Sequence, residues 1–167
     1  MALTAPHIDR PVRPLAHVVW QTGYQGGEGR GIEVDPFRRL MYLRQHMLTE
    51  ATAAARRNGR TPRVALYVCT KASAPDPGPV FDRLRTVARV RGMRAGAEFT
   101  DATAPTIPGR GGGFMNMLEH VQHGYADGIL CISYEHVSPD LEEYEEVLRS
   151  ATSRRWFVAL AAPETGA

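Results

Sequence analysis

Reactive side chains follow the most continuous apolar stretch of the sequence. Residues 63–69 (RVALYVC) predict a parallel strand that is buried on both faces, because apolar residues occupy nearly every position. Cys69 ends this stretch, and Thr70, Lys71 and Ser73 follow it. Open α/β sheets carry their sites at the carboxyl ends of their strands. The sequence therefore predicts a site where this strand ends, with a thiol, an amine and hydroxyl groups at hand.

A second reactive pair follows another apolar stretch. Residues 128–133 (GILCIS) predict a second buried strand, and Glu135 and His136 come shortly after it. In a parallel sheet with adjacent strands, Cys69 and Lys71 could lie near this pair and support an enzyme of altered chemistry. The histidines of the chain show no metal-ligand spacing, so the sequence predicts neither a metal nor an organic cofactor.

The elements that position these residues alternate between strand and helix from Arg63 onward. The sequence predicts strands over 63–69, 94–100, 128–133 and 156–162. It predicts helices over 80–91 and 114–123, and a third helix that Ser138-Pro139 opens. Short connections between alternating strands and helices indicate right-handed crossovers. We therefore expect an α/β fold of three layers, a mostly parallel sheet with helices on both faces.

Residues 1–60 predict an N-terminal extension to a domain over 61–167. Residues 1–15 are rich in proline and predict an extended arm, and 17–24 with 31–34 could form a short hairpin. Residues 35–59 give the longest helix signal, with Asp35 as N-cap and Asn58-Gly59 as the stop. A wide apolar stripe along this helix must be buried, whereas most of its arginines are expected on a solvated face.

Composition and charge exclude some classes of protein. The 43% hydrophobic and 23% charged residues are those of an ordinary globular protein, and no apolar run reaches the ~18 residues of a membrane span. The N-terminus does not resemble a signal peptide, so we expect a cytoplasmic protein without a membrane partner. Cys69 and Cys131 are expected to be reduced and buried. A net charge of +2 does not by itself indicate a nucleic-acid partner.

Residues 63–162 resemble the catalytic domain of the serine recombinases, the resolvase and invertase family. That family opens with a strand ending in Tyr-x-Arg-x-Ser, and Tyr67 stands at the tyrosine position. The segment FDRLRTVARVRGM resembles the helix that follows in the family, and Asp101 and Arg110 match at the family's spacing. The resemblance covers about three-fifths of the chain. It implies a resolvase-like fold.

The same resemblance implies that the catalytic groups are missing. Serine recombinases attack a DNA phosphodiester with a serine hydroxyl, and arginines offset the charge of the phosphoryl oxygens. Lys71 stands in place of the serine, Cys69 in place of an arginine, and Glu135-His136 in place of an Asp-Arg pair. Loss of one preorganised charge stabiliser commonly slows a reaction ~10²–10³-fold. We therefore predict no intact catalytic residue and the remains of a pocket at Tyr67, Cys69, Lys71, Ser73, Arg110, Glu135 and His136.

These observations predict a serine recombinase-like protein that has lost DNA cleavage and religation and acts through protein association as a homodimer. Two alternatives stay open: an enzyme of altered chemistry, and a non-catalytic DNA- or RNA-binding accessory that uses Arg110 and the arginines of helix 35–59. The acidic residues of 140–146 argue that one face repels nucleic acid. Few residues follow Ala162, so helix 35–59 is expected to cover the surface that the family's long dimer helix would cover.

Overall fold

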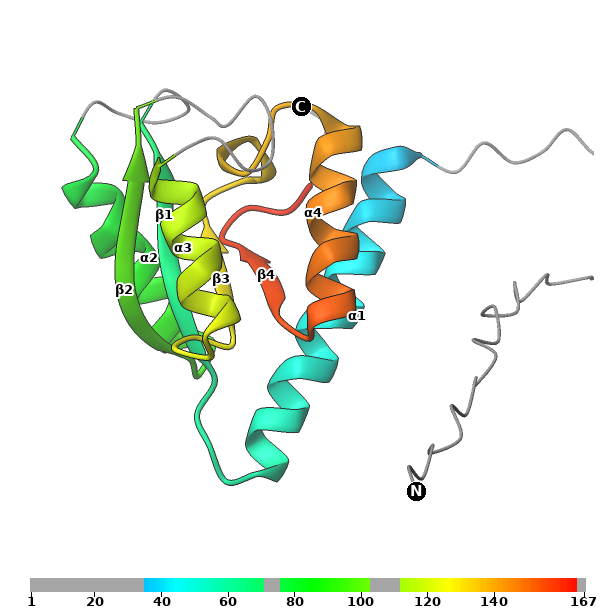
Figure 1. Cartoon of the computed structure of the whole chain (residues 1–167), viewed down its shortest axis with the longest axis vertical. Coiled ribbons are helices and arrows are strands. Elements are labelled where there is room, and N and C mark those ends of the chain that lie inside the picture. Colours follow the sequence, from blue (N-terminus) through cyan, green and yellow to red (C-terminus); the bar gives the residue numbers. More distant parts are fainter. Residues whose placement is uncertain (1–34, 71–75, 103–111, 165–167) are drawn as a thin grey trace, which may run out of the picture. The chain divides into compact units, whose positions relative to one another are not determined.

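A computed structural model describes residues 35–70, 76–102 and 112–164 (Figure 1). The predicted arm over 1–15 and the predicted hairpin of 17–24 and 31–34 lie outside these ranges. The described residues all belong to one compact unit. Within the described ranges, no helix combines the length and the apolar character that crossing a membrane requires.

A four-stranded sheet lies at the centre of the fold, and all of its strand pairs are parallel. The strand order is β2-β1-β3-β4, from β1 (Arg63–Cys69), β2 (Arg94–Asp101), β3 (Gly128–Cys131) and β4 (Phe157–Leu160). The prediction for β1 is confirmed residue for residue. β3 and β4 are shorter than predicted, although backbone pairing continues from Ala161 to Cys131 and from Ala162 to Ile132.

Helices cover both faces of the sheet, which confirms the predicted α/β class. α2 (Gly78–Val90) lies on one face, where Phe81 and Leu84 pack on the strands. α3 (Gly112–Gln122) and α4 (Leu141–Arg154) lie on the other face, where Met117 and Tyr144 are fully buried (Figure 1). The buried side chains of these helices belong to the same apolar clusters as the strands.

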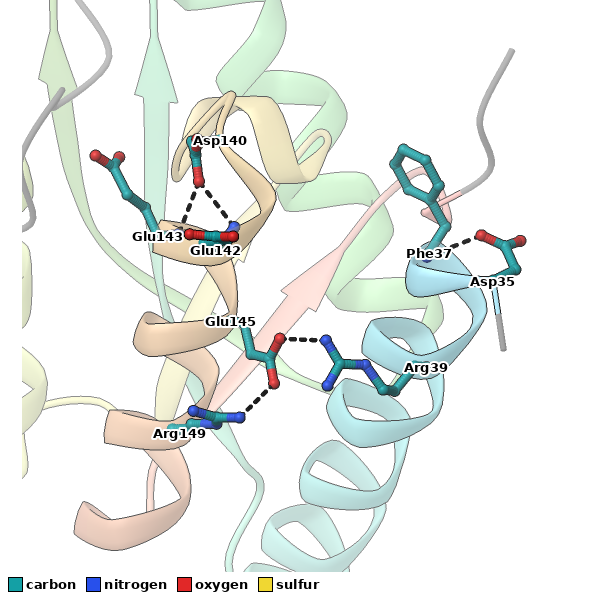
Figure 2. Close-up of polar contacts among 8 residues, drawn as sticks. All are labelled: Asp35, Phe37, Arg39, Asp140, Glu142, Glu143, Glu145 and Arg149. Carbon is teal, nitrogen blue, oxygen red and sulfur yellow. Dashed lines mark hydrogen bonds and ion pairs between the residues drawn. The ribbon is translucent and has the colours of Figure 1, made fainter. Parts of the chain in front are cut away.

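The start of α4 corrects a prediction. A short 3-10 helix, η1 (Tyr134–His136), follows β3, and α4 begins at Leu141 rather than at Ser138-Pro139. The reason is the Asp140 side chain, which accepts hydrogen bonds from the backbone N–H groups of Glu142 and Glu143 and so caps α4 (Figure 2). The Ser138 hydroxyl instead accepts from the Asp140 N–H and stabilises the turn before the helix.

α1 (Pro36–Arg57) packs against β4 and α4 of its own chain. Asp35 caps it by accepting from the Phe37 N–H, as predicted, and Gly59 ends it with a φ of +66°. Figure 2 shows Glu145 of α4 between Arg39 of α1 and Arg149. The proposed domain boundary between residues 60 and 61 stays a prediction, although α1 contributes buried side chains to the same core as the sheet.

The order in which the chain adds strands to the sheet reverses direction between β1 and β3. The chain moves from β1 outward to β2 across one face, and then returns past β1 to β3 and β4 across the other. Open parallel sheets usually carry their binding site at such a reversal. The site lies in the crevice outside the carboxyl ends of the two strands. In this chain that place is the end of β1 and β3, at Cys69 and Cys131.

Candidate functional site

Both cysteines at the end of β1 and β3 are buried. Cys69 and Cys131 are free thiols with no exposed surface, and both belong to the core between the sheet, α3 and α4. Burial raises the pKa of the Cys131 thiol, because a thiolate would be poorly solvated there. The prediction that both cysteines are buried is confirmed, and they pack in the core as small apolar residues.

The His136 side chain caps the end of β1 through a hydrogen bond. Its Nδ1 accepts a hydrogen bond of 2.9 Å from the backbone N–H of Cys69, and the residue is only 1% exposed. Burial lowers the pKa of His136, and the opposing effect of the Glu135 charge is smaller. The imidazole is therefore neutral near pH 7 and acts as a cap for a backbone group. The sequence pattern indicated His136 as a reactive candidate; the structure shows it buried and capping a backbone N–H.

Tyr67 and Asp101 form a second side-chain contact at this edge. The Tyr67 hydroxyl donates to Asp101 Oδ2 over 3.0 Å, and the Tyr67 side chain is fully buried. Burial, followed by the negative charge of Asp101, raises the pKa of Tyr67. Its ring also packs edge to face on Phe114, with 5.3 Å between the ring centroids. Tyr67 is therefore held in place from both its ring and its hydroxyl.

Asp101 connects β2 to the start of α3. Its carboxylate accepts from the Gly113 N–H over 2.8 Å and from the Phe114 N–H over 2.7 Å. These are N–H groups of the first turn of α3, which have no partner within the helix. The close approach requires glycine at position 113, because a Cβ there would lie 2.2 Å from the Thr100 carbonyl oxygen. The negative charge at a helix N-terminus is favourable.

The structure brings together only some of the predicted pocket residues. Tyr67, Cys69 and His136 lie at one edge of the sheet, and each is buried. Glu135 lies beside His136 in sequence and is exposed. Lys71, Ser73 and Arg110 lie outside the described residues. Cys69 and His136 do touch, but through a backbone N–H, so the contact is not that of a nucleophile with a base.

Sequence reasoning missed a buried ion pair near the same edge. Arg44 of α1 donates from Nε and Nη2 to the two carboxylate oxygens of Glu164, over 2.5 and 2.8 Å. The Tyr144 hydroxyl donates to the same carboxylate over 2.9 Å. Burial alone would raise the pKa of Glu164, but the hydrogen bond and charge of Arg44 outweigh it and the pKa is lowered. Most arginines of helix 35–59 were expected on a solvated face; Arg38, Arg39, Arg56 and Arg57 are exposed there, and Arg44 is the buried one.

The arrangement at this edge holds the fold together. The carboxylate of Asp101 and the imidazole of His136 both accept hydrogen bonds from backbone N–H groups, and Tyr67 is bonded to Asp101. Across the ranges that the structure describes, no three His, Cys, Asp or Glu side chains are grouped so that they could hold a metal ion. Asp101 was matched to the family by its position, but nothing in the local sequence signalled its bonds to α3.

Comparisons with known proteins give a similarity among solved structures. No protein-family profile matches the sequence, and no curated protein sequence matches it. Among solved structures, the chain is similar to the C-terminal catalytic domain of ISC1926 TnpA, an IS607-like serine recombinase. The two chains are 13% identical, the TM-score is 0.49, and the match covers 60% of this chain and 70% of the other.

Proposed function

We propose that this chain is a serine recombinase-like protein that has lost DNA cleavage and acts by associating with a second copy of itself. The observation that carries the loss of cleavage is the bonding of the described side chains at the end of β1. His136 caps a backbone N–H, and Asp101 caps α3 while it binds Tyr67. Groups engaged in this way support the fold and are not available to a phosphodiester.

The sequence resemblance supplies the other half of this proposal. The position of the family's serine nucleophile is occupied by Lys71, and two further positions that carry cations in the family are Cys69 and His136. The neutral, buried state of His136 means that it does not replace a cation. The combined loss of a nucleophile and of charge stabilisers removes several factors of ~10²–10³ in rate. An amine cannot form the phosphoserine link on which religation depends.

The burial of Cys69 disfavours an enzyme of altered chemistry at this edge. Its side chain has no exposed surface, whereas reactive cysteines lie in partly exposed surroundings next to cations. The imidazole nitrogen nearest to it already accepts from its backbone N–H. The nucleic-acid accessory is favoured by a different observation, the exposed arginines at the C-terminal ends of α1 and α4.

Self-association requires an apolar surface, and the described residues offer two large exposed apolar side chains on α2 and α1. Val90 at the end of α2 is 78% exposed, and Tyr42 on α1 is 57% exposed. Burying such a side chain at an interface is worth about 1.5–3 kcal/mol when it becomes fully covered. One of these two residues is therefore expected to lie in the contact between the copies.

Sedimentation equilibrium tests the association. The wild-type chain is expected to sediment as a dimer at micromolar concentration, and Val90→Glu or Tyr42→Glu is expected to shift it toward the monomer. Thr86→Glu, an exposed polar position on α2, is the matched control and should leave the mass unchanged. A wild-type chain that stays monomeric at every concentration would contradict the homodimer.

A further inference from the structure

Arginines gather at the amino end of the sheet, opposite the edge described above. The C-termini of the four α-helices and the starts of the strands lie at this end, toward the bottom of Figure 1. Arg57 on α1, Arg154 on α4 and Arg155 are exposed there, with Arg60 before β1. Asp127 forms ion pairs with Arg60 and Arg63. Its Oδ1 lies 3.1 Å from Arg60 Nη1, and its Oδ2 lies 3.8 Å from Arg63 Nε. Basic residues near helix C-termini are favourable in any fold, so their position alone does not imply a ligand.

Two adjoining pockets open between these arginines. The first, of about 410 Å³, lies between α1 and α4 and is lined by Arg57 and Arg60. The second, of about 550 Å³, is lined by Gly124 and Arg154. Asp127, Arg155 and Trp156 line both, so the pockets form one continuous surface. The Trp156 indole N–H beside them is buried and has no acceptor among the residues that the structure describes.

Arg155 occupies a backbone conformation that disfavours it. Its φ is +61°, in the left-handed region, and no other non-glycine residue of the described ranges has a positive φ. Glycine takes this conformation after α1, α2 and α3, at Gly59, Gly92 and Gly124. Arg154, in the last turn of α4, already places a cation at the helix end. The end of α4 therefore does not itself require an arginine at position 155, where the side chain lines both pockets.

An exposed aromatic cluster borders the second pocket. Tyr125 is 63% exposed, and its ring lies 5.1 Å from that of His120 and 6.2 Å from that of His123. Arg63 Nη2 donates to the Gly124 carbonyl over 2.7 Å, which holds a guanidinium next to Tyr125. Exposed aromatic rings between cations are the features on which unpaired bases stack in proteins that bind single strands.

We propose that the amino end of the sheet binds single-stranded nucleic acid along a basic track formed by Arg57, Arg60, Arg63, Arg154, Arg155 and Tyr125. The arginines contact successive phosphates, and Tyr125 stacks on a base. This proposal rests on the nucleic-acid accessory role and is independent of the homodimer. It places the nucleic acid at the end of the sheet opposite to Cys69 and His136.

The opposite end of the sheet carries exposed carboxylates. In the described part of the chain, Asp76, Glu135, Asp140 and Glu142 are exposed at or near the carboxyl ends of the strands. Figure 2 shows Asp140 and Glu142 together at the start of α4. Carboxylates in this position repel phosphates, so the charge pattern orients a polyanion toward the basic track.

Fluorescence anisotropy on the full chain tests the proposal with a labelled 20-nucleotide oligo(dT) strand. Arg155→Gly and Tyr125→Ala remove the two features that carry the argument. Arg38→Ala and Arg83→Ala are matched controls, since Arg38 on α1 and Arg83 on α2 are exposed away from the track. Arg155→Gly also relieves the left-handed strain, so its melting temperature should equal or exceed that of the wild type. A loss of binding in this variant is then not a loss of folding.

We expect Arg155→Gly and Tyr125→Ala each to weaken binding about fivefold or more, and the controls by less than about twofold. The slope of log K against log salt should become shallower by about 0.7 in Arg155→Gly, as for one lost phosphate contact on a single strand. Equal weakening by Arg38→Ala and Arg155→Gly would overturn the track, because only net charge would matter.

Three further outcomes would also overturn the proposal. These are no binding by the wild type at 50 mM salt, tighter binding of duplex than of single strand, and equal competition by polyglutamate. None of them bears on the sedimentation result, so failure of the track and failure of the homodimer are distinguishable.

Discussion

Asp101 and His136 accept hydrogen bonds from backbone N–H groups that have no partner in a helix or a strand ladder. Asp101 takes those of Gly113 and Phe114, and His136 takes that of Cys69. A buried N–H left without an acceptor costs about 1–3 kcal/mol. At the scale of single residues, Asp101 and His136 therefore contribute to the free energy of unfolding by satisfying these N–H groups.

The bond between Cys69 and His136 predicts a pH dependence of stability. Because burial lowers the pKa of His136 in the folded protein, the unfolded chain binds more protons below its ordinary pKa of about 6.5. Stability is therefore fully present above that pH and is lost as the pH falls below it. Urea unfolding between pH 7.5 and 5.5 measures this, and His136→Asn should flatten the dependence.

His120→Asn is the control for that measurement, because burial and then Arg63 lower the pKa of His120 as well. Its substitution should remove a separate part of the pH dependence. Identical pH dependences in the wild type and in His136→Asn would show that the imidazole does not carry the effect.

The buried pair of Arg44 and Glu164 predicts a large effect of a single substitution. Arg44→Met leaves the Glu164 carboxylate buried without its cation, and we expect a loss of about 3–5 kcal/mol in the free energy of unfolding. Arg44→Met with Glu164→Gln should recover much of that loss. Arg39→Met breaks an exposed pair on the same helix and should cost less than about 1 kcal/mol. Equal effects at Arg39 and Arg44 would contradict the account.

Local interactions of single residues were predictable and distant ones were not. Asp35 and Pro36 mark the start of α1 through contacts within a few residues, and the sequence shows both directly. His136 and Cys69 are 67 positions apart, and Arg44 and Glu164 are 120 apart. No periodicity or cap signals such a pair, because its geometry depends on how β1, β3, β4 and α1 meet in the finished fold.

At the scale of elements, the start of α3 depends on a close approach to the end of β2. The N–H groups of Gly113 and Phe114 reach Asp101 only because position 113 has no side chain. Gly112, one residue earlier, has open space where a Cβ would be. Glycine is therefore required at position 113 but not at position 112.

Alanine at each of these glycines tests this dependence. Gly113→Ala places a Cβ 2.2 Å from the Thr100 carbonyl oxygen and should lower the free energy of unfolding by about 1–3 kcal/mol. Gly112→Ala should be neutral or stabilising by up to about 1 kcal/mol, because alanine favours a helix. Thermal or urea unfolding measures both. A destabilisation of similar size in the two variants would contradict the close approach.

Element type was more predictable than element ends. The apolar run of β1 and the spacing of the helix faces specified the parallel sheet, since both are local patterns. The end of β3 was predicted too late, because the apolar Ile132 continues the pattern beyond Cys131, where β3 ends, and η1 begins at Tyr134. Burial by neighbouring elements, which the sequence does not show, decides where such a strand ends.

At the scale of the whole described unit, charge divides between the two ends of the sheet. Arg57, Arg60, Arg154 and Arg155 are exposed at the amino end, and Asp76, Glu135, Asp140 and Glu142 at or near the carboxyl end, where Arg38 and Arg39 at the start of α1 are exposed as well. This division agrees with the helix dipoles, because α1, α2 and α4 carry basic residues in their last turns. Among the described residues, the charges near Cys69 and His136 therefore disfavour binding of a phosphate at that edge. The charges at the opposite edge favour it.

The absence of strand cleavage is the central claim, and a covalent adduct is its most direct test. The full chain is incubated with supercoiled plasmid and with a pool of random duplexes, then denatured and examined for DNA that stays attached to protein. A cleaving serine recombinase with its own site on a plasmid serves as the positive control. We predict no adduct and no relaxation of the plasmid. Protein joined covalently to a DNA end under these conditions would contradict the account.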